Sequence, residues 1–361
     1  MKIYLQYPWR FPDSPYYKYL IGSPPKGIEF LNTEREKGAA TSNKSLRLMN
    51  FVKVRIRRWA NKLKLNIPNS HKSPPGNYDL IHCTHCLSKN KNKPWVADVE
   101  SIWSIFIGGN RTKKGQDKVR KILMRSNCKK ILPWTKSIEK NYLEMFPEVK
   151  DKIELVYPAI PEIKNLKKPI NKKLKIIFVA RFFHLKGGLI ALETMERLRK
   201  KYEVECIVVS NVPTELKKKY SKLIIHDLLP HEEVCKLLES SDLFFYPCPN
   251  DTFGFSLLEA MAFGLPTITI NTRWTKSRQE IIENGETGLM FDVKNKLSMD
   301  GITDKEEVVI KKLVKNASIL IKNDNLRGKM SKECIKKISN GKFSVEERNK
   351  KLKKIYEEAR I

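Results

Sequence analysis

Two carboxylates flank a glycine turn in the C-terminal half of the sequence. Asp251 and Glu259 lie eight positions apart, with Gly254 between them and apolar residues at helical spacing after it. An apolar run precedes the turn and a β-rich run follows it, so the order is strand, glycine turn, helix, strand. Such a turn aims backbone N–H groups at an anion above the helix N-terminus. The two acids would lie at the edges of that site, where carboxylates accept hydrogen bonds from hydroxyl groups.

Two cations follow another predicted strand of the same half. Arg181 comes directly after the apolar run 174–180, and Lys186 lies five residues further on, ahead of a predicted helix. A guanidinium binds phosphate through paired hydrogen bonds, whereas an ammonium acts as a point charge. In a lysine-rich chain, two such residues can also be solvated surface charges. Because they accompany a glycine turn and two acids, we favour a diphosphate site.

The alternation of predicted elements indicates how these residues are positioned. From residue 174 onward, strands and helices alternate at short spacing, which is typical of a doubly wound, parallel α/β domain. Such sheets bind ligands at the carboxyl ends of their strands. The N-terminal half shows a weaker version of the pattern, with strands predicted at 2–7, 78–83, 95–100, 130–132 and 153–157. We therefore predict two domains, 1–165 and 172–342, and a closing helix within 343–361.

The composition narrows the class of protein. With 361 residues and 41% hydrophobic content, the chain can bury a proper core in each domain. Its net charge of +30 either attracts phosphates of a nucleotide, nucleic acid or membrane, or reflects a bias toward lysine. The seven cysteines have no repeated spacing, which favours a reducing compartment. Neither a signal peptide nor a membrane span is predicted, so we expect a cytoplasmic protein.

The segment Arg47 to Lys64 predicts a basic amphipathic helix. Its apolar face consists of Leu48, Val52, Ile56, Trp59 and Leu63. A basic helix with a tryptophan on its apolar face is typical of a membrane surface. A surface helix docked on its own domain uses the same pattern, so both alternatives stay open. The first would place the protein peripherally on an anionic inner membrane face.

These motifs together resemble those of the retaining, GT-B-type glycosyltransferases of family 4, the glycosyl transferases group 1. The matching residues are Arg181, Lys186 and Gly187 for an Arg-x4-Lys-Gly run, and Asp251, Phe253, Gly254 and Glu259 for a Glu-x7-Glu run with an inner Phe-Gly. Further agreement lies at 157–160, 241–243 and 284–289. The resemblance covers nearly the whole chain and is strongest from residue 176 to 291.

The resemblance implies a fold and an activity. The fold would be GT-B, with two Rossmann-like, doubly wound domains facing across a cleft and the C-terminal helix closing back toward the N-domain. The enzyme would move a sugar from a UDP- or GDP-linked donor to a hydroxyl of a glycan or lipid-linked acceptor, with retention of configuration, in glycan biosynthesis. It would need no metal or other cofactor, because fixed positive groups can stabilise the leaving diphosphate.

The resemblance also implies roles for residues. Arg181 and Lys186 would hold the diphosphate, Glu259 the ribose hydroxyls, and Asp251 the hydroxyls of the donor sugar. Arg181, Lys186 and Asp251 would be the catalytic residues. The donor-binding set is completed by Phe253, Gly254, Phe255 and Ser256. The first acid is Asp251 where the family has Glu, and its shorter reach puts the identity of the donor sugar in doubt.

The N-terminal half departs from the family pattern. Relatives carry a Gly-rich loop where this chain has the run 7–13, and a His where it has Glu100. Either Glu100 or Asp98 could act as a base near the acceptor hydroxyl, or be a capping or salt-bridged acid. His85 would line the acceptor side. The run 82–86 cannot surround one ion with its own side chains, so we predict no metal site.

Other functions remain as alternatives. The same fold would suit a nucleotide-sugar epimerase, a phosphorylase-like enzyme or a non-catalytic sugar-binding protein. A nucleic-acid-binding protein would account for the charge, but the lysines are not interleaved with aromatic residues as base contacts require, so no specific nucleic acid is expected. The sequence leaves open the nucleobase, the sugar, the acceptor and the oligomeric state.

Overall fold

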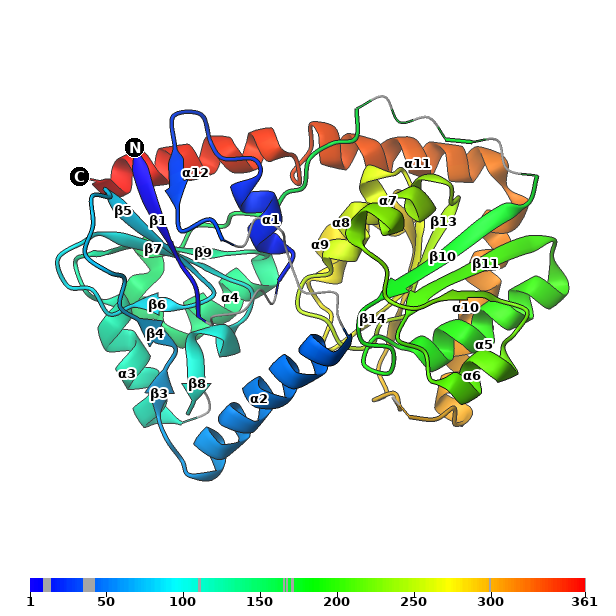
Figure 1. Cartoon of the computed structure of the whole chain (residues 1–361), viewed down its shortest axis with the longest axis horizontal. Helices are drawn as coiled ribbons and strands as arrows, with labels where there is room; N and C mark the ends of the chain where they lie inside the picture. Colours follow the sequence, from blue (N-terminus) through cyan, green and yellow to red (C-terminus); the bar gives the residue numbers. More distant parts are fainter. Residues whose placement is uncertain are drawn as a thin grey trace. The chain divides into compact units, whose positions relative to one another are not determined.

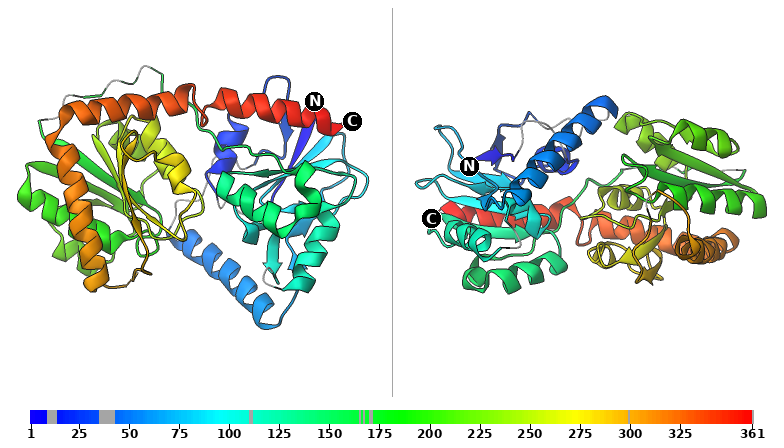
Figure 2. Two further views of the ribbon diagram at one scale, coloured as in Figure 1. Left: turned by 180° about the vertical axis from the view of Figure 1, so that it is seen from behind. Right: turned by 90° about the horizontal axis from the view of Figure 1, so that it is seen from below.

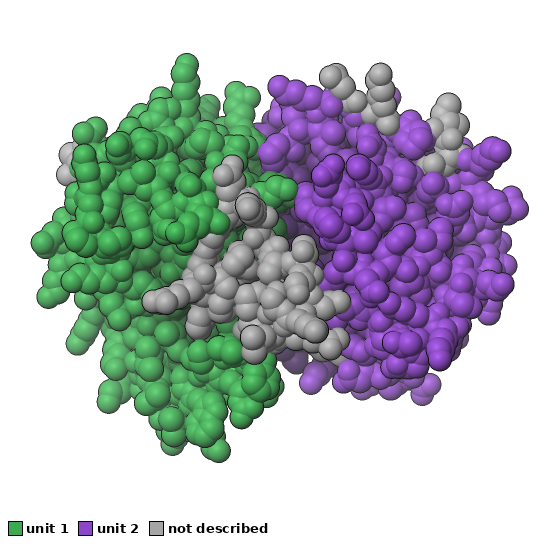
Figure 3. All heavy atoms as spheres, in the orientation of Figure 1, with its two compact units in different colours: residues 1–40, 44–159, 345–361 green, residues 41–43, 160–344 purple. Residues whose placement is uncertain are grey.

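The computed structural model describes residues 1–8, 14–34, 43–109, 112–164, 166, 168–169, 172–298 and 300–360, without the side chains of 43–50. The chain divides into two compact units: unit 1 holds residues 1–40, 44–159 and 345–361, and unit 2 holds 41–43 and 160–344 (Figure 3). Each unit contains its own parallel sheet (Figure 1). Residues 9–13 of the segment that departs from the family pattern lie outside the described residues.

Unit 1 is built on a five-stranded parallel sheet in the order β2-β1-β5-β7-β9. Its strands are β1 (Lys2–Gln6), β2 (Glu29–Leu31), β5 (Leu80–Thr84), β7 (Trp95–Val99) and β9 (Cys128–Pro133). Every residue of β5 and β7 is buried, as in strands covered on both faces. Counted along the unit the order is 2-1-3-4-5, which places a ligand crevice where β1 and β5 meet.

The remaining elements of unit 1 are helices and short strands around this sheet. They are α1 (Tyr16–Ile21), α2 (Asn43–Lys62), α3 (Lys113–Leu123), α4 (Lys136–Met145), α12 (Val345–Arg360) and the short pairs β3 (Ile67–Pro68) with β8 (Phe106–Gly108) and β4 (Ser70–His71) with β6 (Leu87–Ser88). Two 3-10 helices lie at Ile102–Ile105 and Pro147–Lys152. The predicted strand at 153–157 is wrong, because Ile153 pairs only through a single bridge to Ile131.

The C-terminal helix α12 packs within unit 1 although it follows unit 2 in the chain (Figure 1). Ile355 and Tyr356 are fully buried, and the Tyr356 hydroxyl lies 2.7 Å from Nδ1 of His82. Arg348 is also buried and donates to the carbonyl oxygen of Tyr19 at 2.9 Å. The helix is therefore part of the core of unit 1.

Unit 2 is built on a six-stranded parallel sheet in the order β12-β11-β10-β13-β14-β15. Its strands are β10 (Leu174–Ala180), β11 (Val204–Ser210), β12 (Ile224–His226), β13 (Leu243–Tyr246), β14 (Thr267–Thr272) and β15 (Gly288–Val293). Counted along the unit the order is 3-2-1-4-5-6, the Rossmann order, and the strand order reverses between β10 and β13. The predicted doubly wound α/β fold is confirmed in both units.

Helices cover both faces of the unit 2 sheet (Figure 2). They are α5 (Gly188–Lys201), α6 (Thr214–Lys219), α7 (His231–Glu239), α8 (Phe255–Ala262), α9 (Arg278–Ile281), α10 (Asp304–Lys322) and α11 (Asp324–Ser339). Helix α5 packs beside α10, and α8 packs beside α11. None of the helices among the described residues is long and apolar enough to cross a membrane.

Asp242 fixes the register where the strand order of unit 2 reverses. Its Oδ2 accepts a hydrogen bond from the Lys175 amide at 2.8 Å, and its own amide donates to the Lys175 carbonyl at 2.9 Å. These bonds set Ile176 opposite Leu243. Because the carboxyl ends of parallel strands meet at one edge, the loops after β10 and β13 come to the same place.

Candidate functional site

The loop after β10 and the loop after β13 touch at this edge of the sheet. Gly187 has a φ of 76°, and a Cβ built on it would lie 2.4 Å from the carbonyl oxygen of Pro247. Only glycine allows both this conformation and this approach. Lys186 bridges the same two loops, because its Nζ donates to the Asn250 carbonyl at 3.3 Å and to Oδ1 of Asp251 at 2.8 Å. The two predicted motifs therefore form one structure.

Both carboxylate oxygens of Asp251 accept hydrogen bonds. Oδ1 accepts from Lys186 and from the Thr252 amide at 3.0 Å, and Oδ2 accepts from the Tyr246 hydroxyl at 2.8 Å. Burial alone would raise the pKa of Asp251, but the charges of Lys186 and Arg278 and these hydrogen bonds hold it below its usual range. Burial likewise opposes the charge of Lys186, yet Asp251 raises the pKa of that ammonium. The two residues form a mostly buried ion pair, with 17% and 11% of their side chains exposed.

Arg278 supplies a further cation near Asp251, and its sequence position gives no signal of this role. Its side chain is 1% exposed, and Nη1 donates to the carbonyl oxygens of Cys248 at 2.8 Å and Ile270 at 2.5 Å. The guanidinium lies 5.3 Å from the centroid of the Tyr246 ring. Its Nε and Nη2 have no hydrogen-bond partner among the described residues. Burying a charge that is held only by carbonyl oxygens costs free energy. Because little water screens the Arg278 guanidinium, its positive charge acts strongly on the Asp251 carboxylate.

The glycine turn brings the start of α8 beside Asp251. Gly254 precedes the helix with a φ of 100°, and a Cβ on it would lie 3.1 Å from Oδ2 of Asp251. Phe253 is 2% exposed and packs on Phe255 with ring centroids 5.2 Å apart, which anchors the turn. The amides of Phe255 and Ser256 lie in the first turn, where N–H groups have no intrahelical acceptor. The positive end of the helix dipole therefore faces the region of the ion pair.

Glu259 lies on α8, one turn beyond Phe255. It is 14% exposed, and its Oε1 lies 3.1 Å from Nε2 of His231 at the start of α7. Hydrogen bonds that the His231 imidazolium donates to Cys235 and Glu259 raise the pKa of His231 to about 9. At neutral pH a charged imidazole therefore sits beside the acid that the family resemblance links to the ribose.

Arg181 occupies the position expected from the sequence. It follows β10 directly, is partly exposed, and its guanidinium lies 5.8 Å from the centroid of the Phe182 ring. It shares the loop after β10 with Lys186. A guanidinium and an ammonium at the edge where the sheet order reverses suit a ligand with two phosphates.

Asp98 in unit 1 is a buried acceptor for several donors. Its Oδ2 lies 3.0 Å from Nε2 of His82, and its Oδ1 lies 3.2 Å from the His85 amide and 3.4 Å from Nδ1 of His85. Burial would raise the pKa of Asp98, but His85, His82 and Tyr16 outweigh it and hold the pKa below its usual range. A carboxylate of this kind anchors its partners and is a weak base, which matches the salt-bridged alternative for Asp98.

His85 adopts a left-handed backbone conformation at the end of β5. Its φ is 61° and the side chain is 5% exposed. The imidazole packs against Trp134, Tyr16 and Tyr17 at centroid distances of 4.7, 5.6 and 5.8 Å. Non-glycine residues hold this conformation only where the surroundings impose it, commonly at functional sites. Glu100, the other predicted acid, lies directly after β7 and is partly exposed.

Within the described parts of the chain, no group of three or more His, Cys, Asp or Glu side chains is placed to hold a metal ion. Cys83 and Cys86 lie on either side of His85 in the sequence. Both are buried, and both are free thiols rather than partners in a disulfide. Burial raises the pKa of Cys83 well above its ordinary value, so it stays a neutral thiol.

A comparison with protein families shows which family has a sequence model that matches this part of the chain. Residues 160–332 match the family model described as "Glycosyl transferases group 1". The chain resembles the glycosyl transferases of group 1. The matched segment contains Arg181, Lys186, Asp251, Gly254 and Glu259, so the ion pair and the turn at α8 lie within the part of the chain that matches this family model.

Curated relatives agree with this match. The capsular polysaccharide biosynthesis glycosyltransferase CapH of Staphylococcus aureus is 25% identical over 229 residues, which cover 60% of this chain and 61% of that protein. An uncharacterized glycosyltransferase of Haemophilus influenzae is 26% identical over 218 residues, covering 58% and 57%. The chain thus spans about six tenths of the length of the curated relatives it matches, since a third match covers 63% of its relative.

Solved glycosyltransferases share the fold along the whole chain. A glycosyltransferase from Rickettsia africae is 17% identical with a TM-score of 0.63, covering 99% of this chain and 98% of its own. HepE of Anabaena, solved with UDP, is 12% identical with a TM-score of 0.61, covering 99% and 100%. WaaG, a glycosyltransferase involved in lipopolysaccharide biosynthesis, is 12% identical with a TM-score of 0.56, covering 99% of each chain. At such identities the likeness concerns the fold, and the predicted GT-B architecture of two Rossmann-like units is confirmed.

Three residues that lie beside the predicted site residues were not predicted from the sequence. Tyr246 ends an apolar strand and gives no signal of its hydroxyl's bond to Asp251. Arg278 stands in a polar run that is typical of an exposed helix start. His231 opens α7 after a proline and could have been noticed, because it begins the helix just beyond a strand end on the same sheet edge.

Proposed function

We propose that this chain is a retaining glycosyltransferase that moves a sugar from a nucleotide-sugar donor to a hydroxyl of a glycan or lipid-linked acceptor. The observation that carries the proposal is the Lys186–Asp251 pair beside the start of α8, at the reversal of a Rossmann sheet. The structure of HepE with UDP motivates a UDP-linked donor, with GDP as the alternative. CapH, named for capsular polysaccharide biosynthesis, motivates a glycan acceptor.

The proposed chemistry relies on fixed positive charge. Arg181, Lys186 and the first amides of α8 would bind the diphosphate, and negative charge builds on that group as the glycosidic bond breaks. Groups that are already oriented stabilise this charge without reorganisation, and losing one typically costs about 100- to 1,000-fold in rate. An ammonium has three N–H donors. In this structure Lys186 donates one hydrogen bond to Asn250 and one to Asp251. The remaining one suffices for a phosphate oxygen without breaking the ion pair, so we propose a reaction that needs no metal or other cofactor.

The acids would orient the donor. Glu259 would accept hydrogen bonds from the ribose hydroxyls in place of His231, or alongside it. Asp251 would accept a hydrogen bond from a hydroxyl of the donor sugar at the one lone-pair position, on Oδ2, that Lys186, Thr252 and Tyr246 leave open. Because Asp251 is held from three sides, its carboxylate offers a fixed direction to the sugar, and this direction would select which hydroxyl is bound.

A binding screen tests the donor assignment. We expect UDP and a UDP-sugar to raise the melting temperature of the protein, because a ligand that binds only the folded state stabilises it. Arg181→Ala and Glu259→Gln should each reduce this shift and lower kcat/KM by at least about 100-fold. Lys218→Ala, on the exposed side of α6, is the matched control and should behave like the wild type. Wild-type shifts and rates in both site variants would refute the proposal.

The reaction type needs a separate test. A radiolabelled donor should yield a product in which the label is joined to the acceptor, and NMR of the anomeric proton should show the configuration of the donor. Free epimerised sugar nucleotide would instead identify an epimerase, and phosphate-dependent release of sugar phosphate a phosphorylase-like enzyme. An inverted anomeric configuration would contradict retention.

We further propose that unit 1 rests on an anionic membrane through α2, at the inner membrane face. The apolar side chains Val52, Ile56, Trp59 and Leu63 are 39, 41, 53 and 57% exposed. The helix instead packs through Ala60, which is 4% exposed. The exposure of these side chains favours the membrane alternative over an apolar face docked on unit 1.

Basic residues flank the apolar face of α2. They are Lys53, Arg55, Arg58 and Lys62 within the helix and Lys64 just beyond its end. An apolar face with a tryptophan, bordered by cations, suits a surface of anionic lipid headgroups. We expect flotation with vesicles that contain phosphatidylglycerol but little with neutral phosphatidylcholine, and loss of flotation in a Trp59→Glu and Leu63→Glu double variant. Equal binding to both vesicle types, or flotation that survives the double variant, would remove the membrane role.

A further inference from the structure

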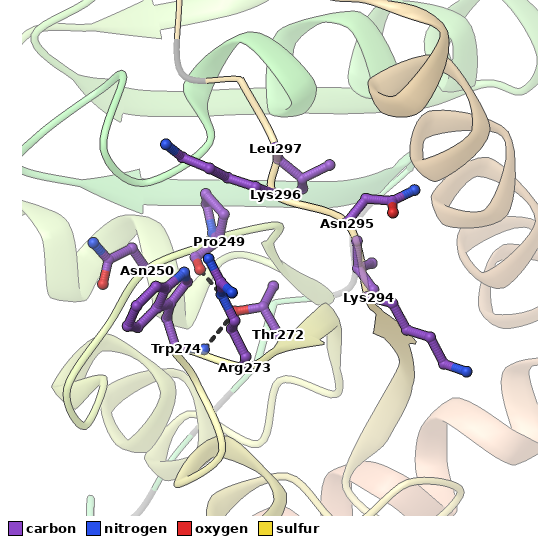
Figure 4. A pocket seen from close by; sticks show the side chains of 10 residues that line it. Pro249, Asn250, Thr272, Arg273, Trp274, Lys294, Asn295, Lys296 and Leu297 are labelled. Carbon is purple, nitrogen blue, oxygen red and sulfur yellow. Dashed lines mark hydrogen bonds between the residues drawn. The ribbon is translucent and has the colours of Figure 1, made fainter.

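A pocket of about 200 Å³ opens at the carboxyl ends of β14 and β15 in unit 2 (Figure 4). Three loops line it: Pro249 and Asn250 after β13, residues 272–274 after β14, and residues 293–297 after β15. It lies on the opposite side of the β13 loop from the residues after β10 that we assign to the diphosphate. The lining shares Asn250, whose carbonyl accepts from Lys186, but none of the other donor-site residues described above, so the pocket is a neighbouring site.

The pocket combines an aromatic face with cations. Trp274 is 55% exposed, and the guanidinium of Arg273 lies 4.6 Å from the centroid of its ring. Figure 4 shows Arg273 in the middle of the lining residues and the ammonium of Lys294 directed away from them. Lys296 is exposed at the rim. Across the part of the chain that the structure describes, Arg273 and Lys296 make no ion pair with a carboxylate, so both charges are available to an anion.

Hydrogen bonds hold the loop that carries Trp274 against the loop after β13, which leads into Asp251. The Thr272 hydroxyl donates to the Pro249 carbonyl at 2.8 Å and accepts from the Trp274 amide at 3.1 Å (Figure 4). Pro249 and Asn250 lead directly into Asp251 of the donor site. A group bound in the pocket would therefore lie against the same backbone segment that carries the carboxylate proposed to orient the donor sugar.

We infer that this pocket binds an anionic sugar unit of the acceptor, one that carries a phosphate or a carboxylate. The acceptor role rests on the proposed glycosyltransferase function, whereas the binding of an anionic sugar does not. The face of an indole packs against the apolar C–H face of a sugar ring, and an arginine beside it pairs with phosphate or carboxylate oxygens. The buried side chains of Val293 and Leu297 add an apolar wall to the pocket. A pocket of this size has room for one monosaccharide rather than a longer glycan.

The binding step can be measured with simple probes. Protein labelled with 5-fluorotryptophan would be titrated with glucose 6-phosphate, glucuronate, glucose and inorganic phosphate, and the ¹⁹F signal of Trp274 assigned from a Trp274→Phe variant. We expect one or both anionic sugars to shift this signal saturably, and neutral glucose to need at least about tenfold higher concentration, since one charge-assisted pair is worth about a factor of ten or more. The phosphate and carboxylate arms identify which anion the pocket prefers.

Two variants decide whether the cation beside the tryptophan is responsible. Arg273→Gln should weaken binding of the anionic sugar about tenfold or more, whereas Lys294→Gln, whose ammonium points away in Figure 4, should change it less than about twofold. Neutral glucose binding as tightly as the anions, no shift of the Trp274 signal, or unchanged affinity in Arg273→Gln would overturn the inference.

A parallel titration keeps this inference distinct from the proposed function. UDP binding, followed by the melting temperature, should be unchanged in Arg273→Gln and reduced in Arg181→Ala. A protein that binds anionic sugar at Trp274 but no nucleotide would contradict the donor assignment and with it the acceptor role. A protein that binds UDP but no anionic sugar would overturn the pocket while leaving the donor assignment in place.

Discussion

At the scale of single residues, the candidate donor site is organised around an ion pair that is ready before any ligand arrives. Asp251 is fixed by Lys186, Tyr246 and a backbone amide, and Arg278 adds positive charge close by. The pair has two consequences, one for stability and one for the donor. Each partner keeps the other charged in a buried setting, and the carboxylate is held in a set direction, which the proposed function assigns to a sugar hydroxyl.

The stability consequence can be tested by removing one charge at a time. Lys186→Met leaves Asp251 buried with less compensation and should lower the free energy of unfolding by about 2–4 kcal/mol, near the lower end expected for a buried pair. The double variant Lys186→Met, Asp251→Asn should recover part of this loss, because no uncompensated charge remains. Urea denaturation followed by circular dichroism measures both. Additive losses in the double variant would show that the two side chains do not interact.

The same pair sets a pH range. The pKa of Asp251 is lowered, so its contribution to stability is present above about pH 4 and is lost as the pH falls through the lowered value. The pKa of Lys186 is raised, so its contribution is present below about pH 10 and is lost as the pH rises through the raised value. The ion pair therefore persists through the neutral range.

His231 predicts a pH dependence inside that neutral range. Its pKa is raised to about 9 in the folded protein, so its contribution to stability is full below about pH 6.5 and is lost as the pH rises through about 9. In wild-type protein the melting temperature should fall across this window by more than in His231→Gln. His226→Gln, on the neighbouring strand β12, is the control and should keep the wild-type slope. Parallel slopes in wild type and His231→Gln would contradict the assignment.

At the scale of elements, the site depends on two loops that approach without side chains between them. Gly187 lies against Pro247, and the turn at Gly254 lets α8 begin beside a carboxylate. Strand periodicity and the glycine positions made these loops predictable from the sequence. The partners that complete them were not, because Tyr246 and Arg278 act through a hydroxyl and a guanidinium whose direction is set only by tertiary packing.

Gly187→Ala should separate these loops. The new Cβ would meet the Pro247 carbonyl at 2.4 Å in a backbone conformation that L-residues rarely adopt. We expect a loss of about 3 kcal/mol or more, because steric displacement adds to about 1 kcal/mol of conformational cost, and weaker UDP binding. Gly285→Ala is the matched control, since Gly285 has a φ of 88° with nothing within 4 Å of a built Cβ. It should show the conformational cost alone, so equal losses in the two variants would mean that the loop contact contributes nothing.

At the scale of the whole molecule, the chain builds two independent cores from an interleaved path. Residues 345–361 return to unit 1 after the whole of unit 2 has been completed. Amphipathic spacing predicts the last helix, but its packing place depends on contacts far away in sequence, such as the bond between Tyr356 and His82. The sequence likewise does not show what the apolar face of α2 contacts. A helix that packs on its own domain and a helix that binds a membrane have the same amphipathic pattern.

Removing a side chain from the inner face of α12 should therefore weaken unit 1 and spare unit 2. Ile355 is fully buried, and α12 packs on β5 and β9, so Ile355→Ala should cost about 2–5 kcal/mol of local stability. Lys354→Ala, at an exposed neighbouring position, is the control. Amide hydrogen exchange read by mass spectrometry should show faster exchange in peptides from β5 and β9 and unchanged protection in β10 and β13, since cooperative units open separately. Equal loss of protection in both units would show that they unfold as one body and that α12 couples the candidate donor site to the core of unit 1.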